Sequence, residues 1–328
     1  MIEAVAVLRA AGDGDAEILQ RLLEQERECA NVIGLNPYWG GRVQPLHMAV
    51  TWGQEESVRI LLEAGAHPSG ENEGYGGWSP LMLAATKGLD GIVTRLEDAG
   101  AYIGLFEAAA LGRTRTVAEI LVGNQERARR VMVDGTTPLH MAATGDIADL
   151  LLDAGAIPTL RDGYGATPLD AALVRAGRGA QGADEVAERI IEAGAEADLM
   201  TFAALGDEIR LARELDRAPQ ALDEQNRAGT TPLLAAVAHG RLETVRLLLS
   251  RGANPNLPDS DGIQPLHWSA RAPRDDLAIA RALLASGGNP RGRDGQHKTT
   301  PASWAEFQRR PELERLLRTA ETAPPVTP

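Results

Sequence analysis

The stretch Thr137-Pro138-Leu139-His140-Met141-Ala142-Ala143 decides how this chain folds. Thr137 stands where a helix begins, and its side-chain oxygen can accept a hydrogen bond from an amide of the first turn. Pro138 suits the first helical position, because that position needs no N–H donor and the fixed φ of proline already matches a helix. Leu139 can point into a core, and the two alanines let another backbone approach closely. The stretch therefore predicts the start of a short helix packed against a neighbour.

The same sequence motif recurs along the chain, in places at a nearly constant spacing. Pro45 and Pro80 lie 35 residues apart, and Pro232 and Pro265 lie 33 residues apart. A leucine-rich string that ends in Gly-Ala follows several of these openings, and its glycine suits the left-handed C-cap of a second helix. The copies of the opening begin at Gln44, Ser79, Thr137, Thr167, Thr231, Gln264 and Thr300.

This pattern resembles the ankyrin repeat, whose recurring string is Thr-Pro-Leu-His-x-Ala and whose period is about 33 residues. The resemblance implies an all-α ankyrin-repeat solenoid, in which stacked helix–turn–helix pairs are joined by short β-hairpin fingers. We expect about ten repeats, some of them divergent, in a single array over residues 1–318, and a disordered proline-rich tail over residues 319–328. The repeats are expected near residues 4–24, 44–66, 79–101, 104–122, 137–156, 167–195, 198–216, 231–253, 264–288 and 300–318.

Two repeats inside the array have lost the Thr-Pro opening. Residues 105–112 and 199–206 keep the alanines and the turn glycine of the pattern. Residues 99–143 align with residues 193–237 at a constant shift of 94 and without gaps, so we infer that a block of about three repeats was duplicated. Each divergent repeat should still form a helix pair.

Charge and cysteine usage restrict the function. The net charge of −13 argues against nucleic acid or an anionic membrane as the main partner. Cys29 is the only cysteine, so no intrachain disulfide can form and a reducing compartment is favoured. No apolar run of 18 residues occurs, and we therefore expect a soluble, cytoplasmic protein.

A glycine-rich insertion, residues 176–182, is expected between the two helices of the sixth repeat. It contains Gly-x-Gly-x-x-Gly over Gly177–Gly182, which in another context would indicate dinucleotide binding. That motif binds a pyrophosphate only where it follows a strand, and here the preceding residues 168–174 have the pattern of a helix. A nucleotide-binding enzyme that uses this loop is therefore the least favoured function.

No other motif indicates catalysis or metal binding. His47, His140 and His267 occupy the fourth position of the repeat opening, where the resemblance implies a hydrogen bond to neighbouring backbone. Residues 259–262 begin like a calcium loop, but the twelfth position is Ala270, where a glutamate is required, so a hairpin tip fits better. We expect no cofactor, no metal and no enzyme activity.

The resemblance implies that a protein partner binds the concave face, which hairpin tips and first helices form. Large aromatic residues are enriched in binding hot spots, and several of them concentrate between residues 38 and 78. They either form such a hot spot or cover glycine-rich loops, whereas Trp268 and Trp304 should pack inward. The residues expected to bind the partner are Trp39, Trp52, Tyr75, Trp78, Lys87, Tyr164, Arg175 and His239.

Two functions fit this surface. The first is a non-catalytic protein–protein interaction module that binds its partner on the concave face. The alternative is a regulatory or immunity-type subunit that inhibits or protects a specific partner enzyme. A basic partner would suit both, because opposite charges speed the encounter of two proteins.

Overall fold

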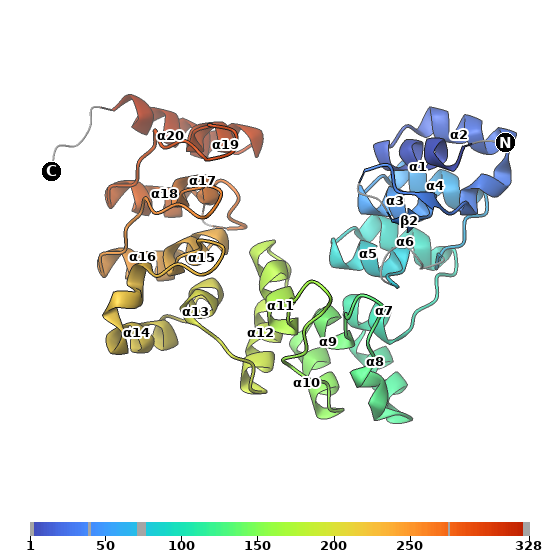
Figure 1. The fold of residues 1–328 in the computed structure, drawn as a ribbon, viewed down its shortest axis with the longest axis horizontal. Helices are drawn as coiled ribbons and strands as arrows, with labels where there is room; N and C mark the ends of the chain where they lie inside the picture. The colour runs from blue at the N-terminus through green and yellow to red at the C-terminus, as the bar shows by residue number, and fades with distance from the viewer. Residues whose placement is uncertain (1–2, 39–40, 71–76, 275, 324–328) are drawn as a thin grey trace. The chain divides into compact units, whose positions relative to one another are not determined.

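A computed structural model describes residues 3–38, 41–70, 77–274 and 276–323, and these residues are mostly helical (Figure 1). They form two compact units. Unit 1 comprises residues 1–172 and 185–195, and unit 2 comprises residues 173–184 and 196–328. The one sheet in the described ranges is a hairpin in which β1 (Gly34–Leu35) pairs antiparallel with β2 (Arg42–Val43). The predicted all-α class is confirmed.

Helix pairs follow one another in chain order through unit 1 (Figure 1). The first helices of successive pairs contact each other, α1 with α3, α3 with α5, α5 with α7 and α7 with α9. The pairs are α1 (Ala4–Asp13) and α2 (Ala16–Gln25), α3 (Pro45–Thr51) and α4 (Glu55–Glu63), α5 (Pro80–Thr86) and α6 (Asp90–Asp98), α7 (Leu105–Ala110) and α8 (Thr114–Val122), α9 (Pro138–Met141) and α10 (Gly145–Asp153), with short 3₁₀ helices η1 (Arg27–Asn31) and η2 (Gln125–Arg129).

Unit 2 repeats this arrangement, with α13 against α15, α15 against α17 and α17 against α19. Its pairs are α13 (Leu199–Leu205) and α14 (Glu208–Arg217), α15 (Pro232–Ala238) and α16 (Leu242–Ser250), α17 (Pro265–Ser269) and α18 (Asp276–Ala285), α19 (Pro301–Phe307) and α20 (Pro311–Thr322), with the 3₁₀ helix η3 (Pro219–Asp223).

One further pair, α11 (Pro168–Gly177) and α12 (Ala183–Glu192), contributes residues to both units. The described residues therefore hold ten helix pairs, which agrees with the predicted number of repeats. The last helix, α20, continues to Thr322, beyond the position at which we expected a disordered tail to begin. Residues 324–328 of that tail lie outside the described residues.

At some repeat openings the side chain that the pattern supplies caps the first helix, whereas Gln44 and Thr300 make no such hydrogen bond. Ser79 Oγ accepts from Met82 N at 3.2 Å, and Thr231 Oγ1 accepts from Leu234 N at 3.1 Å. At Thr137 the hydroxyl lies 2.8 Å from the His140 ring nitrogen Nδ1.

The divergent repeats begin their first helices with a carboxylate in place of the Thr-Pro opening. Asp198 Oδ1 accepts from Thr201 N at 2.8 Å, and Glu107 Oε2 accepts from Gly104 N at 3.1 Å. Since each carboxylate satisfies an amide at the helix start, the helix pair survives the loss of the opening. The prediction that both divergent repeats form helix pairs is confirmed.

The core combines buried side chains of the second helices with the leucine that follows most repeat prolines and the small residues behind it. Full burial of one leucine side chain stabilises a fold by about 1.5–3 kcal/mol relative to an exposed one. The alanines that accompany these leucines let neighbouring first helices approach closely. The buried leucines at this position are Leu46, Leu81, Leu139, Leu169, Leu233 and Leu266.

Candidate binding surface

The loops that precede the first helices form stacked fingers. In unit 2, Asn226 and Asp259 each begin a finger, and one side-chain oxygen accepts from the backbone amides two and four residues later. Asp162 in unit 1 does the same, at 2.9 Å for both bonds. Ser260 N donates to Ala228 O of the preceding finger at 3.1 Å. Asp259 thus holds a hairpin turn, as the sequence predicted.

Three histidines each bond the repeat that carries them to the following repeat. In each case the acceptor is the carbonyl two residues before the proline that opens the following repeat. The ring of His267 is fully buried, and desolvation lowers its pKa. The predicted backbone-bonding role is confirmed, with Nε2 of His47, His140 and His267 at 3.1 Å from the carbonyl oxygens of Trp78, Ala166 and Thr299.

Trp52, predicted to bind the partner, lies at the end of α3 and half of its surface is exposed. Its ring packs edge-on against Tyr38, with 5.6 Å between the centroids. Gly12 lies beneath both rings, and a Cβ there would come within 3.2 Å of Trp52 Cδ1. Burial, followed by the Asp13 carboxylate that accepts from its hydroxyl, raises the pKa of Tyr38. The exposed aromatic pair is therefore held in place by the first two repeats.

Trp78 and Lys87 contact residues far away in the sequence. Trp78 is half-buried against the core of the N-terminal repeats, and its indole N–H donates to Asp134 Oδ2 at 2.7 Å. Lys87 is exposed at the end of α5, and its Nζ donates to Thr51 O at 2.7 Å. Both side chains thus help to hold repeats together. Trp39 and Tyr75, two other residues predicted to bind the partner, lie outside the described residues.

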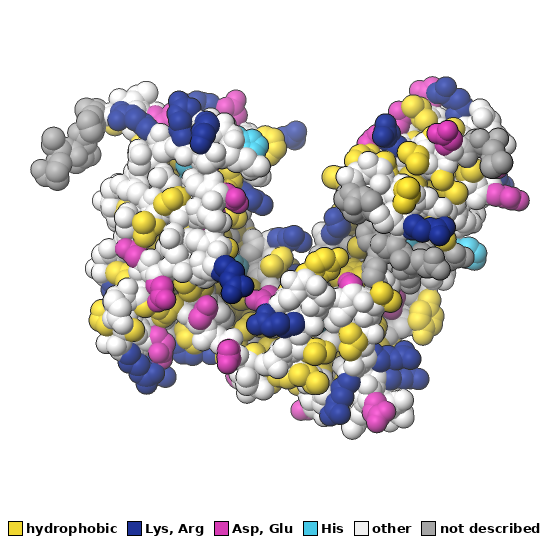
Figure 2. All heavy atoms as spheres, viewed as in Figure 1, with side chains coloured by type: hydrophobic (Ala, Val, Ile, Leu, Met, Phe, Trp, Pro, Cys, Tyr) yellow, Lys and Arg dark blue, Asp and Glu magenta, His cyan; other side chains and the backbone are white. Residues whose placement is uncertain are grey.

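Tyr164 stands at the tip of a finger, with 87% of its surface exposed. The preceding finger presents Val133, which is 90% exposed, and the two fingers are joined by a hydrogen bond from Gly163 N to Asp134 O at 2.6 Å. Hydrophobic side chains at the surface are visible in Figure 2. Sequence reasoning missed Val133, because in the repeat alignment it falls opposite Gly163 and not opposite Tyr164.

Comparison with known families agrees with this geometry. A family model of ankyrin repeats matches residues 7–104, 105–201 and 199–294, which together are most of the chain. The chain is an ankyrin-repeat protein. The stacked fingers and the histidine bonds recur in phase with its repeats, so they belong to the ankyrin framework.

Several known proteins are similar to parts of this ankyrin array. Neurogenic locus notch homolog protein 1 of Rattus norvegicus is 28% identical over 273 residues, which are 76% of this chain and 9% of that protein. Potassium channel KOR1 of Oryza sativa subsp. japonica is 32% identical over 49% of this chain and 23% of its own length. Ankyrin repeat and SOCS box protein 16 of Homo sapiens is 31% identical over 39% of this chain and 32% of its own length. The chain thus spans less than a third of each of these three relatives.

Arg175 and His239, also predicted to bind the partner, are half-buried side chains of unit 2. The two ring nitrogens of His239 lie 2.9 Å from Ala235 O and 3.0 Å from Leu173 O. Desolvation lowers the pKa of His239, and burial lowers that of Arg175 to about 10. A Cβ on Gly177 would approach His239 Nε2 to 3.0 Å. His239 therefore packs the second half of α11 against α15.

The glycine-rich motif begins at Gly177, the last residue of α11, and ends just before α12. A helix precedes it, where a dinucleotide site would need a strand. Within unit 2, Asp184 near the start of α12 pairs with Arg241. The insertion thus joins two helices of an ankyrin pair.

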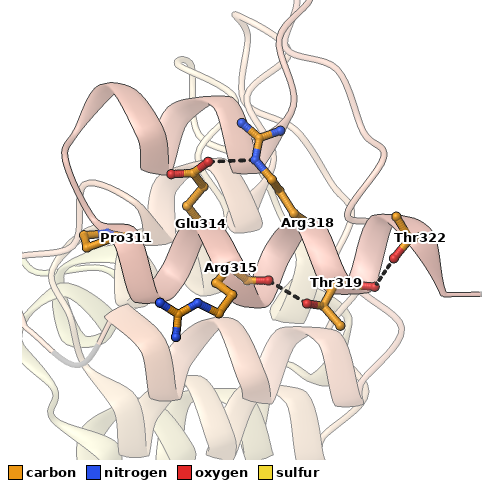
Figure 3. A pocket seen from close by; sticks show the side chains of 6 residues that line it. All are labelled: Pro311, Glu314, Arg315, Arg318, Thr319 and Thr322. Atoms are coloured by element: carbon orange, nitrogen blue, oxygen red, sulfur yellow. Dashed lines mark hydrogen bonds and ion pairs between the residues drawn. The ribbon is translucent and has the colours of Figure 1, made fainter.

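A shallow pocket lies on the exposed face of α20 (Figure 3). Its polar side chains bond within the helix and to α19: Arg318 donates to Glu314 and to Glu306, both at 2.7 Å, and Thr319 Oγ1 donates to Arg315 O at 2.8 Å. In the ranges that the structure describes, no three His, Cys, Asp or Glu residues come together as a metal site would need. Likewise, no helix in those ranges is long and apolar enough to cross a membrane.

Proposed function

We propose that this protein is a non-catalytic interaction module that binds a protein partner on the concave face formed by its fingers and first helices. Ankyrin repeats are generally protein-interaction modules. The observation that carries the proposal is the pair Val133 and Tyr164: large apolar side chains at the tips of two hydrogen-bonded fingers, almost fully exposed. Exposed apolar side chains on hydrogen-bonded fingers are suited to partner binding. Because the fingers are already ordered, little conformational entropy is lost when a partner covers these side chains.

Charge distribution supports a basic partner for unit 1. Unit 1 carries 14 basic and 27 acidic residues, whereas unit 2 carries 19 of each, so the net charge of −13 belongs to unit 1. Opposite charge on the partner would raise the association rate, and added salt would lower it.

We also propose a cytoplasmic location, since the only cysteine, Cys29, is buried as a thiol and desolvation raises its pKa.

The test begins with an affinity pull-down by the full chain, followed by mass spectrometry and a titration of the captured protein. Tyr164→Ala and Trp52→Ala should each weaken binding by about 1–3 kcal/mol, because each removes an exposed aromatic contact. Trp78→Ala is a poorer test, since it also removes the hydrogen bond to Asp134.

Val133→Ser and Val122→Ser form a matched pair for the same titration. Both valines belong to unit 1 and are 90% and 87% exposed, but Val122 ends the second helix α8 and lies outside the fingers. Binding should weaken only with Val133→Ser. Equal affinity of the Tyr164 and Val133 variants and the parent chain would contradict the proposed surface.

A further inference from the structure

The turns between first and second helices stack along one edge of unit 2. Arg310, at the start of α20, reaches back to the preceding turn, with Nη2 at 3.4 Å from Ala272 O and Nη1 at 3.6 Å from Asp276 Oδ2. The turn before that one is equally close, because a Cβ on Gly240 would meet Arg274 O at 2.8 Å. The turns at residues 240–241, 271–274 and 309–310 are therefore consecutive neighbours.

This edge presents three exposed arginines, Arg271, Arg274 and Arg309, which we call the basic edge. The Arg271 guanidinium lies 5.1 Å from the centroid of the Trp268 ring, and Arg274 shares Asp184 with Arg241 at a distance of 3.8 Å. For Arg309, no carboxylate in the described ranges forms an ion pair. Lys and Arg side chains are visible over the region of α15 to α20 in Figure 2. The edge thus has cationic groups that the fold itself does not neutralise fully.

Arg309 occupies this edge at a conformational cost. Its φ is 57°, in the left-handed region, whereas the corresponding turns of other repeats have glycine, such as Gly53 at 68° and Gly240 at 66°. A side chain in this region is strained by contact between its Cβ and the backbone, and glycine avoids that strain. Glycine at this position would allow the same stacking of turns without the strain. Strain of this kind makes a residue a candidate for a functional role, and of the two described ones, Lys298 and Arg309, only Arg309 lies on the basic edge.

We propose that the basic edge binds an acidic segment of a partner protein. The planar guanidinium group pairs with a carboxylate through two parallel hydrogen bonds, which favours aspartate and glutamate side chains as ligands. The net charge of −13 disfavours a long polyanion such as nucleic acid, whereas a short acidic segment can be bound by the edge alone. The inference rests on the proposed protein-binding function, but it names a second surface and a different chemistry from the fingers of unit 1.

The test uses the full chain and a short fluorescein-labelled peptide of alternating glutamate and serine, titrated near physiological ionic strength. Arg309→Gly should weaken binding about tenfold, the loss expected for one charge-assisted contact. The same variant should have a melting temperature equal to or above that of the parent chain, since glycine adopts the left-handed backbone conformation without strain.

Lys298→Gly is the matched control. Lys298 is the other non-glycine residue with positive φ, also 57°, but it lies in the finger before α19, at the opposite end of that helix from Arg309. The Lys298→Gly substitution removes one positive charge and one strained residue, as Arg309→Gly does. Because Lys298 lies outside the basic edge, peptide binding should stay as in the parent chain. Absence of peptide binding, or an equal effect of both variants, would overturn the basic edge as a site. Tighter binding of single-stranded DNA that Arg309→Gly abolishes would overturn the choice of an acidic protein segment. If the partner captured by the fingers still binds while the peptide does not, only this inference fails.

Discussion

At the scale of single residues, Asp294 shows how a finger is held. Its carboxylate is buried and accepts from His297 N at 2.6 Å, from Thr299 N at 2.9 Å, from the Thr299 hydroxyl and from the Trp304 indole at 3.3 Å. Burial alone would raise the pKa of this carboxyl group. The hydrogen bonds to its ionised form outweigh burial and hold the pKa of Asp294 well below its usual value.

Asp294→Asn should lower the free energy of unfolding at pH 7 by about 2 kcal/mol, because hydrogen bonds to a charged acceptor are replaced by weaker ones. The folded-state pKa is depressed, so the stabilisation is complete above the unfolded pKa of about 4 and is lost as the pH falls below it. Urea unfolding of both chains at several pH values should show the stability difference shrinking below pH 4. The exposed finger residue Asp261 provides the control variant Asp261→Asn. The stabilising role of Asp294 would be contradicted by a stability difference that stays constant across that pH range, or by an equal loss of stability in the control variant.

At the scale of elements, the fingers behave as a continuous surface because their backbones touch. In unit 1, Gly163 donates to Asp134 O, and a Cβ on Gly163 would come within 2.9 Å of that oxygen. The absence of a side chain on Gly163 therefore allows two fingers to bond directly.

Gly163→Ala should destabilise unit 1 by about 1–3 kcal/mol, because the added methyl group forces the two backbones apart. Gly123→Ala is the control: that glycine follows α8 with a negative φ, and nothing lies within 4 Å of its Cβ position. It should be neutral or stabilising by roughly 0.4–1 kcal/mol. Chemical denaturation of the three chains checks both values, and equal stabilities of the two variants would refute the close approach.

At the scale of the whole molecule, each repeat contacts mainly its neighbours, so local damage should stay local. Arg241 reaches further than most side chains in unit 2. Its Nε donates to Ala204 O at 2.7 Å, its Nη2 pairs with Asp184, and only 11% of the side chain is exposed. This arginine thus links the sixth, seventh and eighth repeats.

Arg241→Ala should therefore destabilise unit 2 by about 2 kcal/mol, since it leaves the Ala204 carbonyl and the Asp184 carboxylate without this donor. Hydrogen exchange followed by mass spectrometry should show faster exchange across α13–α16 and unchanged exchange across α3–α6 of unit 1. Equal acceleration in both sets of helices would show that the array responds as one cooperative block.

The number and phase of the helix pairs were determined by the sequence alone. Most repeats carry their own proline, buried leucine and small residues, and a stack of this kind needs only contacts between neighbours. For the same reason the hydrogen bonds of His140 and its equivalents were predictable, because the acceptor always lies at the same place in the next repeat.

Only the tertiary structure decided which predicted binding residues face the solvent. Trp78 bonds to a carboxylate 56 residues away and His239 to a carbonyl 66 residues away, whereas Tyr164 and the unpredicted Val133 remain exposed. The period places each of these residues on a finger or a first helix. Whether the side chain is then exposed or bonded depends on which residues of other repeats lie against it, and the period does not fix those residues.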